Sequence, residues 1–139
     1  MLRFAKWLQT LVGISVVFMG VAYNTTRAAE QAEPAQFQTI SAAELSEGLN
    51  DKDFVLVNVH IPYEGEIAGT DLFVPYDQIA TRLREFPSDK GKAIVLYCRS
   101  GRMSEIAAMT LVRLGYSKVS HLANGMNGWT AAGFPLLRR

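Results

Sequence analysis

The residue best suited to chemistry is Cys98, the only cysteine among the 139 residues. It directly follows the apolar run AIVLY at 93–97, and Arg99 and Arg102 come just after it. Ligands bind at the carboxyl ends of strands in parallel sheets, and nearby cations and a following helix N-terminus favour thiolate over thiol. The spacing therefore predicts a reactive nucleophile at Cys98, against the alternative of a buried, inert cysteine.

No histidine stands beside Cys98 as a general base, and a stabilised thiolate does not need one. Two arginines and a run of backbone N–H groups would instead hold an anionic leaving group, such as a sulfur or phosphorus oxyanion. A single cysteine excludes an internal disulfide and a multi-thiolate metal site. His121 is interpreted as structural, and His60 as either a hydrogen-bonded loop residue or a substrate contact. We expect neither a metal nor a cofactor.

Short apolar segments alternate with helical segments along the chain. The segments expected to form strands are 37–40, 54–59, 72–74, 93–97 and 118–121. The runs FVLVNV and AIVLY are apolar and rich in β-branched residues, as is typical of strands buried on both faces. Strands alternating with helices of this length predict an α/β fold, in which helices cover both faces of a parallel sheet.

Four helices are expected between and after these strands. Ser41 and Glu44 have the spacing of a capping box, which opens the first helix. The other three are expected over 77–86, 104–115 and 125–133. The apolar residues singled out on the second and third helices are Ile79, Leu83 and Phe86, and Ile106, Met109 and Val112.

The charge balance excludes one class of partner. The chain has 14 basic and 13 acidic side chains, which gives a net charge of +1. Nucleic-acid binding draws on a broad positive field, which this balance does not supply. Nucleic acid is therefore not an expected partner.

An uncharged stretch follows a short basic start at the N-terminus and ends at Arg27. This layout predicts an export segment over 1–28, either a cleaved signal peptide or an uncleaved membrane anchor through 7–23. Residues 29–36 are rich in Ala, Glu and Gln and are expected to form a linker. The positive-inside rule keeps the basic start in the cytoplasm, so residues 30–139 are expected to be periplasmic or otherwise extracytoplasmic.

Three motifs, in order, resemble those of single-domain rhodaneses, the thiosulfate sulfurtransferase family. YCRSGRMS at 97–104 resembles the active-site loop of the family, and VLVNVHIPYEGEIAGT at 55–70 is similar to its segment near the start of the domain. LANGMNGWTAAGFPL at 122–136 is similar to its C-terminal ending. The resemblance implies a rhodanese domain over 37–139 with a five-stranded parallel sheet between helices.

The resemblance also implies a reaction cycle and its participants. Cys98 would attack the outer sulfur of thiosulfate, sulfite would leave, and the resulting persulfide would pass its sulfur to cyanide or a thiol. The implied partners are thus a small-molecule sulfur donor and a thiophilic acceptor, with no protein partner identified. The implied substrate-binding residues are Arg99, Ser100, Gly101, Arg102, Met103 and His60.

The chain departs from the common family loop C-R-x-G-x-R, because Arg102 stands in the fifth place and Met103 in the sixth. Arg102 then either faces the pocket or faces solvent. In the second case Met103 would make the pocket apolar enough for a bulkier sulfur donor, such as an organic persulfide. Asn58 and His60 stand where the family often has Asp and Arg.

Two other functions were weighed. Phosphatases and arsenate reductases of related fold need C-x5-R, but the sixth residue after Cys98 is Ser104, so that pattern fails. The alternative to a sulfurtransferase is an extracytoplasmic rhodanese-like binding module without sulfur-transfer turnover. Such modules usually lack the cysteine that this chain has.

Overall fold

A parallel five-stranded sheet occupies the centre of residues 36–139, the part of the chain that this computed structural model describes. Its strand order is β1-β5-β4-β2-β3, and every neighbouring pair is parallel. The strands are β1 (Gln38–Ile40), β2 (Val55–Asn58), β3 (Leu72–Phe73), β4 (Ile94–Tyr97) and β5 (Val119–Leu122). The predicted α/β fold with five parallel strands is confirmed.

The expected export segment at 1–28 lies outside the described residues, as does the expected linker except for Gln36. Between residues 36 and 139, no helix has the length and apolar character needed to cross a membrane. Export and anchoring through 7–23 therefore stay predictions.

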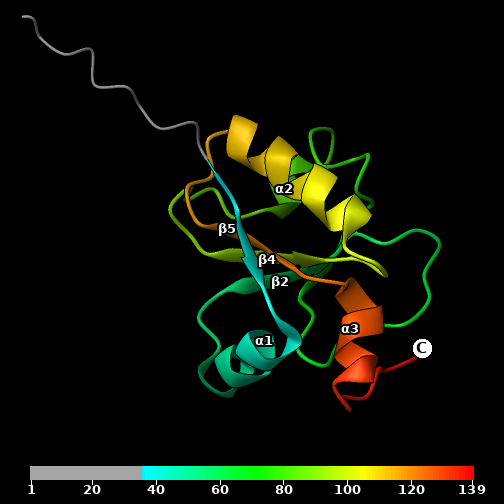
Figure 1. Cartoon of the computed structure of the whole chain (residues 1–139). Helices are drawn as coiled ribbons and strands as arrows, with labels where there is room; N and C mark the ends of the chain where they lie inside the picture. The colour runs from blue at the N-terminus through cyan, green and yellow to red at the C-terminus, as the bar shows by residue number, and fades with distance from the viewer. Residues whose placement is uncertain (1–35) are drawn as a thin grey trace, which may run out of the picture. The chain divides into compact units, whose positions relative to one another are not determined.

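Helices cover both faces of the sheet, as Figure 1 shows. One buried cluster packs α2 against one face, and a second packs α1 and α3 against the other. The predicted capping box opens α1, since Ser41 Oγ accepts from the Glu44 N–H and the Glu44 carboxylate accepts from the Ser41 N–H. The helices are α1 (Ala42–Gly48), α2 (Arg102–Arg113) and α3 (Gly125–Ala131), with short 3-10 turns η1 (Leu49–Asp51) and η2 (Leu83–Glu85).

The helix expected over 77–86 is wrong. The structure has a series of turns there, with only the short η2 as regular structure. Ile79 and Phe86 are buried, as apolar residues at that spacing suggested, but turns bury them equally well. The Arg82 side chain binds both the Glu85 carboxylate and the Phe73 carbonyl, which ties the segment to the edge strand in a non-helical path.

Helix α2 differs from its prediction at its start and on its buried face. It begins at Arg102 rather than at Ser104, because Gly101 has a left-handed backbone (φ 100°) and forms the N-cap. Ile106 and Met109 are 39% and 38% exposed. Val112, the third apolar residue singled out on this helix, is buried, and the rest of the buried side is formed by Ser104, Ala107, Ala108 and Leu111.

Candidate active site

Cys98 lies at the carboxyl end of β4 on the face that α2 covers. Side chains alternate along a strand, and Ile94, Leu96 and Cys98 belong to the same buried cluster as α2. The Gly101 N–H donates a hydrogen bond to Cys98 Sγ at 3.0 Å, and Sγ lies 3.6 Å from Ser104 Oγ. Cys98 is only 1% exposed, so the loop and α2 hold its sulfur under cover.

The start of α3 holds the loop after Cys98 in place. The Met126 N–H donates to the Cys98 carbonyl at 2.8 Å, and the Asn127 N–H donates to the Arg99 carbonyl at 3.0 Å. This close approach requires glycine at Gly125, where an added Cβ would lie 2.2 Å from the Cys98 carbonyl oxygen. Asn124 adopts a left-handed backbone (φ 56°), which asparagine tolerates better than most residues do.

We expect Gly125→Ala to destabilise the protein by about 2 kcal/mol, because the new Cβ must push the Cys98 carbonyl away from α3. The measurement is urea unfolding followed by circular dichroism. Gly115→Ala is the matched control, since Gly115 also has a positive φ (96°) but has nothing within 4 Å of its added Cβ. Equal losses for the two variants would contradict the proposed clash.

The two arginines near Cys98 have different surroundings. Arg99 is paired with the Glu64 carboxylate at 3.2 Å, and its side chain is 58% exposed. Arg102 lies in the first turn of α2, is exposed, and makes no ion pair within residues 36–139. Neither guanidinium hydrogen-bonds to Cys98 Sγ, so in the described part of the chain the direct contacts of the sulfur come from Gly101 and Ser104.

The remaining predicted residues are divided between loop and core. Ser100 is exposed, whereas Gly101 is buried. Met103 is half-buried and packs against the cluster under α2. His60 is buried, and its Nε2 lies 2.6 Å from Glu64 Oε2, so Glu64 joins His60 to Arg99.

Asn58, which stands where the family often has Asp, stabilises the loop that carries His60. Its side-chain amide donates to the Gly65 carbonyl at 3.0 Å. Its side-chain carbonyl accepts from the His60 N–H at 3.0 Å. Both groups of the Asn58 amide are therefore used to hold the chain after β2.

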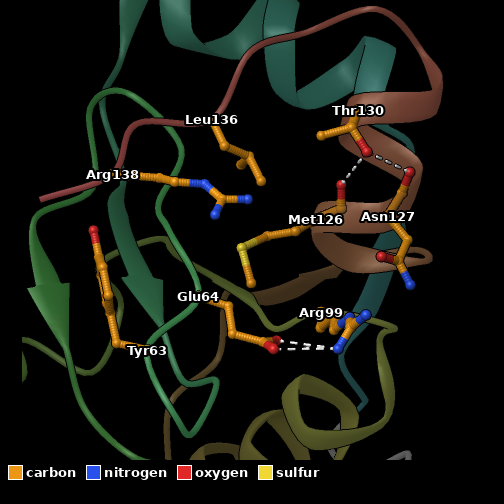
Figure 2. A pocket seen from close by; sticks show the side chains of 8 residues that line it. All are labelled: Tyr63, Glu64, Arg99, Met126, Asn127, Thr130, Leu136 and Arg138. Atoms are coloured by element: carbon orange, nitrogen blue, oxygen red, sulfur yellow. Dashed lines mark hydrogen bonds and ion pairs between the residues drawn. The ribbon is translucent and has the colours of Figure 1, made fainter.

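A pocket of about 400 Å³ opens beside the loop. Figure 2 shows the Arg99–Glu64 pair at one edge of this pocket and Arg138 and Met126 pointing into it from other sides. Its polar and charged lining suits an anionic or polar molecule larger than thiosulfate. The lining residues are Tyr63, Glu64, Arg99, Met126, Asn127, Thr130, Leu136 and Arg138.

Sequence reasoning missed two residues beside Cys98. The sequence predicts only a helix start at Ser104, yet the Ser104 hydroxyl lies 3.6 Å from Cys98 Sγ and 3.0 Å from His121 Nδ1. His121 was interpreted as structural. The register of β4 and β5, which pairs Leu96 with His121, brings this histidine to the same sheet edge as Cys98. A prediction that places β5 next to β4 in the parallel sheet would have put His121 beside the carboxyl end of β4, close to Cys98.

Burial lowers the pKa of His121 below its ordinary value, and the Glu105 carboxylate opposes this in part. The unfolded chain therefore takes up this proton first, and stability is lost as pH falls from about 6.5 toward the folded-state pKa. Between about pH 7.5 and 5.5, the wild type should lose more free energy of unfolding than His121→Asn does. Urea titrations at several pH values measure this, and parallel pH profiles for the two proteins would contradict it.

The comparisons with known proteins agree with this architecture. A family model described as the rhodanese-like domain matches residues 41–132. A sulfurtransferase of Allochromatium vinosum is 35% identical over 102 residues, which cover 70% of this chain and 92% of that protein.

Solved structures also resemble this fold. A rhodanese-related protein from Thermoplasma volcanium has a TM-score of 0.63 at 25% identity, covering 73% of this chain and 98% of that one. A NAD-dependent persulfide reductase from A. fulgidus has a TM-score of 0.55 at 32% identity, covering 67% of this chain and 16% of that one. The relatives support sulfur transfer as the general chemistry, and the chain belongs to the rhodanese-like domain family.

Proposed function

We propose that the chain is a sulfurtransferase that carries sulfane sulfur as a persulfide on Cys98. The observation that carries this proposal is the position of Cys98 Sγ, which accepts the Gly101 N–H just before the N-terminus of α2. A donated hydrogen bond and the positive end of a helix both stabilise negative charge on sulfur. The sulfurtransferase of Allochromatium vinosum, at 35% identity, supports the same chemistry.

The cycle has two displacement steps. In the first, the Cys98 thiolate attacks the outer sulfur of the donor, a new S–S bond forms, and the old bond to that sulfur breaks with its electron pair leaving on sulfite or a thiolate. In the second, cyanide or a thiol attacks the outer sulfur of the persulfide, and Cys98 leaves as a thiolate. Neither step needs an external oxidant, since the sulfur that moves is already at the sulfane level.

An organic persulfide fits the site better as donor than thiosulfate does. Arg99 already pairs with Glu64, which leaves Arg102 as the loop guanidinium available for a small dianion. The pocket of about 400 Å³ shares Arg99 with the loop, although Cys98 does not line it, and it offers polar groups for the organic part of a donor long enough to reach past Arg99. The persulfide reductase from A. fulgidus is a structural relative whose name includes such a substrate.

We further propose that this activity lies outside the cytoplasm, because an export segment is predicted over 1–28. Cell fractionation of the tagged full-length chain tests the location. Recovery of the protein from the cytoplasm alone would overturn it.

The experiment that tests the function is an intact-mass measurement of the purified domain after incubation with thiosulfate and, separately, with an organic persulfide. We expect a gain of one sulfur atom that a reducing thiol removes. No gain with either donor would favour the rhodanese-like binding module without turnover. A gain with the organic persulfide alone would identify the donor class.

A further inference from the structure

A chain of hydrogen bonds runs from Cys98 to β1, buried as far as His121 and exposed at Thr39, and the cycle described above does not use it. Ser104 Oγ lies 3.6 Å from Cys98 Sγ and 3.0 Å from His121 Nδ1. His121 Nε2 in turn lies 3.2 Å from Thr39 Oγ1. Cys98, Ser104 and His121 are 1%, 0% and 7% exposed, so bulk water does not compete for these bonds.

The Ser104 hydroxyl has one proton and three possible acceptors. In the structure Ser104 Oγ donates to the Gly101 carbonyl at 3.0 Å and lies 3.0 Å from His121 Nδ1. The Cys98 thiol, 3.6 Å away, donates to Ser104 Oγ, and a Cys98 thiolate in the same place accepts from it instead. If His121 Nδ1 accepts this proton, the sulfur receives no hydrogen bond from Ser104. If His121 Nδ1 carries its own proton, it donates to Ser104 Oγ and leaves the Gly101 carbonyl and Cys98 Sγ as the acceptors of the hydroxyl proton, of which a negatively charged sulfur is the stronger.

The surroundings of His121 fit the second arrangement. Burial lowers the pKa of His121, with partial opposition from Glu105 on α2, so the ring is neutral and carries a single N–H at neutral pH. Two uncharged residues contact the ring, Phe37 just before β1 and Thr39 within β1. The Thr39 hydroxyl can donate to Nε2, which leaves the ring proton on Nδ1 facing Ser104.

We propose that His121 is a positioning residue for sulfur transfer, which acts through Ser104 to direct a hydroxyl hydrogen bond onto Cys98 Sγ. This inference rests on the proposed function, because it assigns the Ser104 hydroxyl a role in the second displacement. There the acceptor forms a bond to the outer sulfur, the Sγ–S bond breaks, and its electron pair stays on Sγ. A hydroxyl aimed at Sγ stabilises that charge together with the Gly101 N–H.

Three variants of the purified domain test this role. Ser104→Ala removes the hydroxyl. His121→Asn and His121→Gln form a matched pair, because the Asn amide nitrogen takes the place of Nδ1 and can donate to Ser104, whereas the Gln nitrogen takes the place of Nε2 and cannot. Each variant is loaded with an organic persulfide, and the rate of sulfur release to cyanide is measured in a single turnover. The pH midpoint of Cys98 alkylation by iodoacetamide is measured in parallel.

Ser104→Ala and His121→Gln should each slow sulfur release about tenfold and raise the pH midpoint of alkylation, as loss of one hydrogen bond to a charged sulfur predicts. His121→Asn should keep the wild-type rate and midpoint. In the Ser104→Ala background, His121→Gln should have no further effect.

Equal defects in His121→Asn and His121→Gln, or full additivity with Ser104→Ala, would overturn the inference, because either result shows that His121 acts through packing. The alkylation midpoints do not depend on sulfur transfer. A wild type that fails to load sulfur would therefore overturn the proposed function, while matching midpoint shifts in Ser104→Ala and His121→Gln would still support the hydrogen-bond chain.

Discussion

Replacing Cys98 with serine is expected to abolish sulfur transfer while the fold is kept. The nucleophile and the sulfur carrier are the same atom, so its loss should lower turnover about 1,000-fold or more. The serine hydroxyl fits the site of the thiol, where the Gly101 N–H and the Ser104 hydroxyl remain as hydrogen-bond partners. Thiocyanate formation from donor and cyanide measures turnover, and intact mass measures sulfur loading.

The interpretation of this variant is direct, because Cys98 is the only cysteine of the chain. No second thiol can take over the sulfur, and any added mass on the wild type that survives desalting and yields to a reducing thiol reports on this residue. Ser88→Ala is the control, since Ser88 is an exposed serine outside the loop and should keep both loading and turnover. Thiocyanate formation by Cys98→Ser at the wild-type rate would refute the persulfide cycle.

The position of the nucleophile could be predicted from sequence because strands have a strict period of two. Once β4 is placed at the run AIVLY, Cys98 follows at a carboxyl end, and its side chain must share a face with Ile94 and Leu96. The turn at Asn124 and Gly125 could likewise be predicted, since few residue types tolerate a left-handed backbone.

Other parts of the structure depend on contacts that local patterns do not encode. The spacing of Ile79, Leu83 and Phe86 indicates that these side chains face the core. In the structure a series of turns buries Ile79 and Phe86 without forming a helix. Ser104 and His121 are 17 residues apart and meet only because α2 packs over the edge where β4 and β5 end side by side. The Glu64 partner of Arg99 lies 35 residues away, so the sequence suggested Glu64 as a residue that could orient either loop arginine but did not show that it pairs with Arg99.

That difference between the arginines leads to the second large effect. Arg102→Ala is expected to raise the KM for thiosulfate by about 10- to 100-fold and to change the KM for an uncharged organic persulfide little. The reason is that Arg102 is exposed beside the loop and unpaired among residues 36–139, whereas Arg99 is held by Glu64. Steady-state thiocyanate formation with each donor provides both KM values.

Arg113→Ala is the matched control, because it removes the same exposed charge from the last turn of the same helix, far along α2 from Cys98. It should leave both KM values unchanged, which separates a local contact from a change in net charge.

Moving the arginine to the next place by Met103→Arg is a poor substitute test, since Met103 packs against the core under α2 and its replacement would disturb that packing. Equal effects of Arg102→Ala on both donors would show that Arg102 supports the loop instead of binding the anion. The anion contact would then fall to Arg99, which must first give up Glu64, and that cost would weigh further against thiosulfate as the donor.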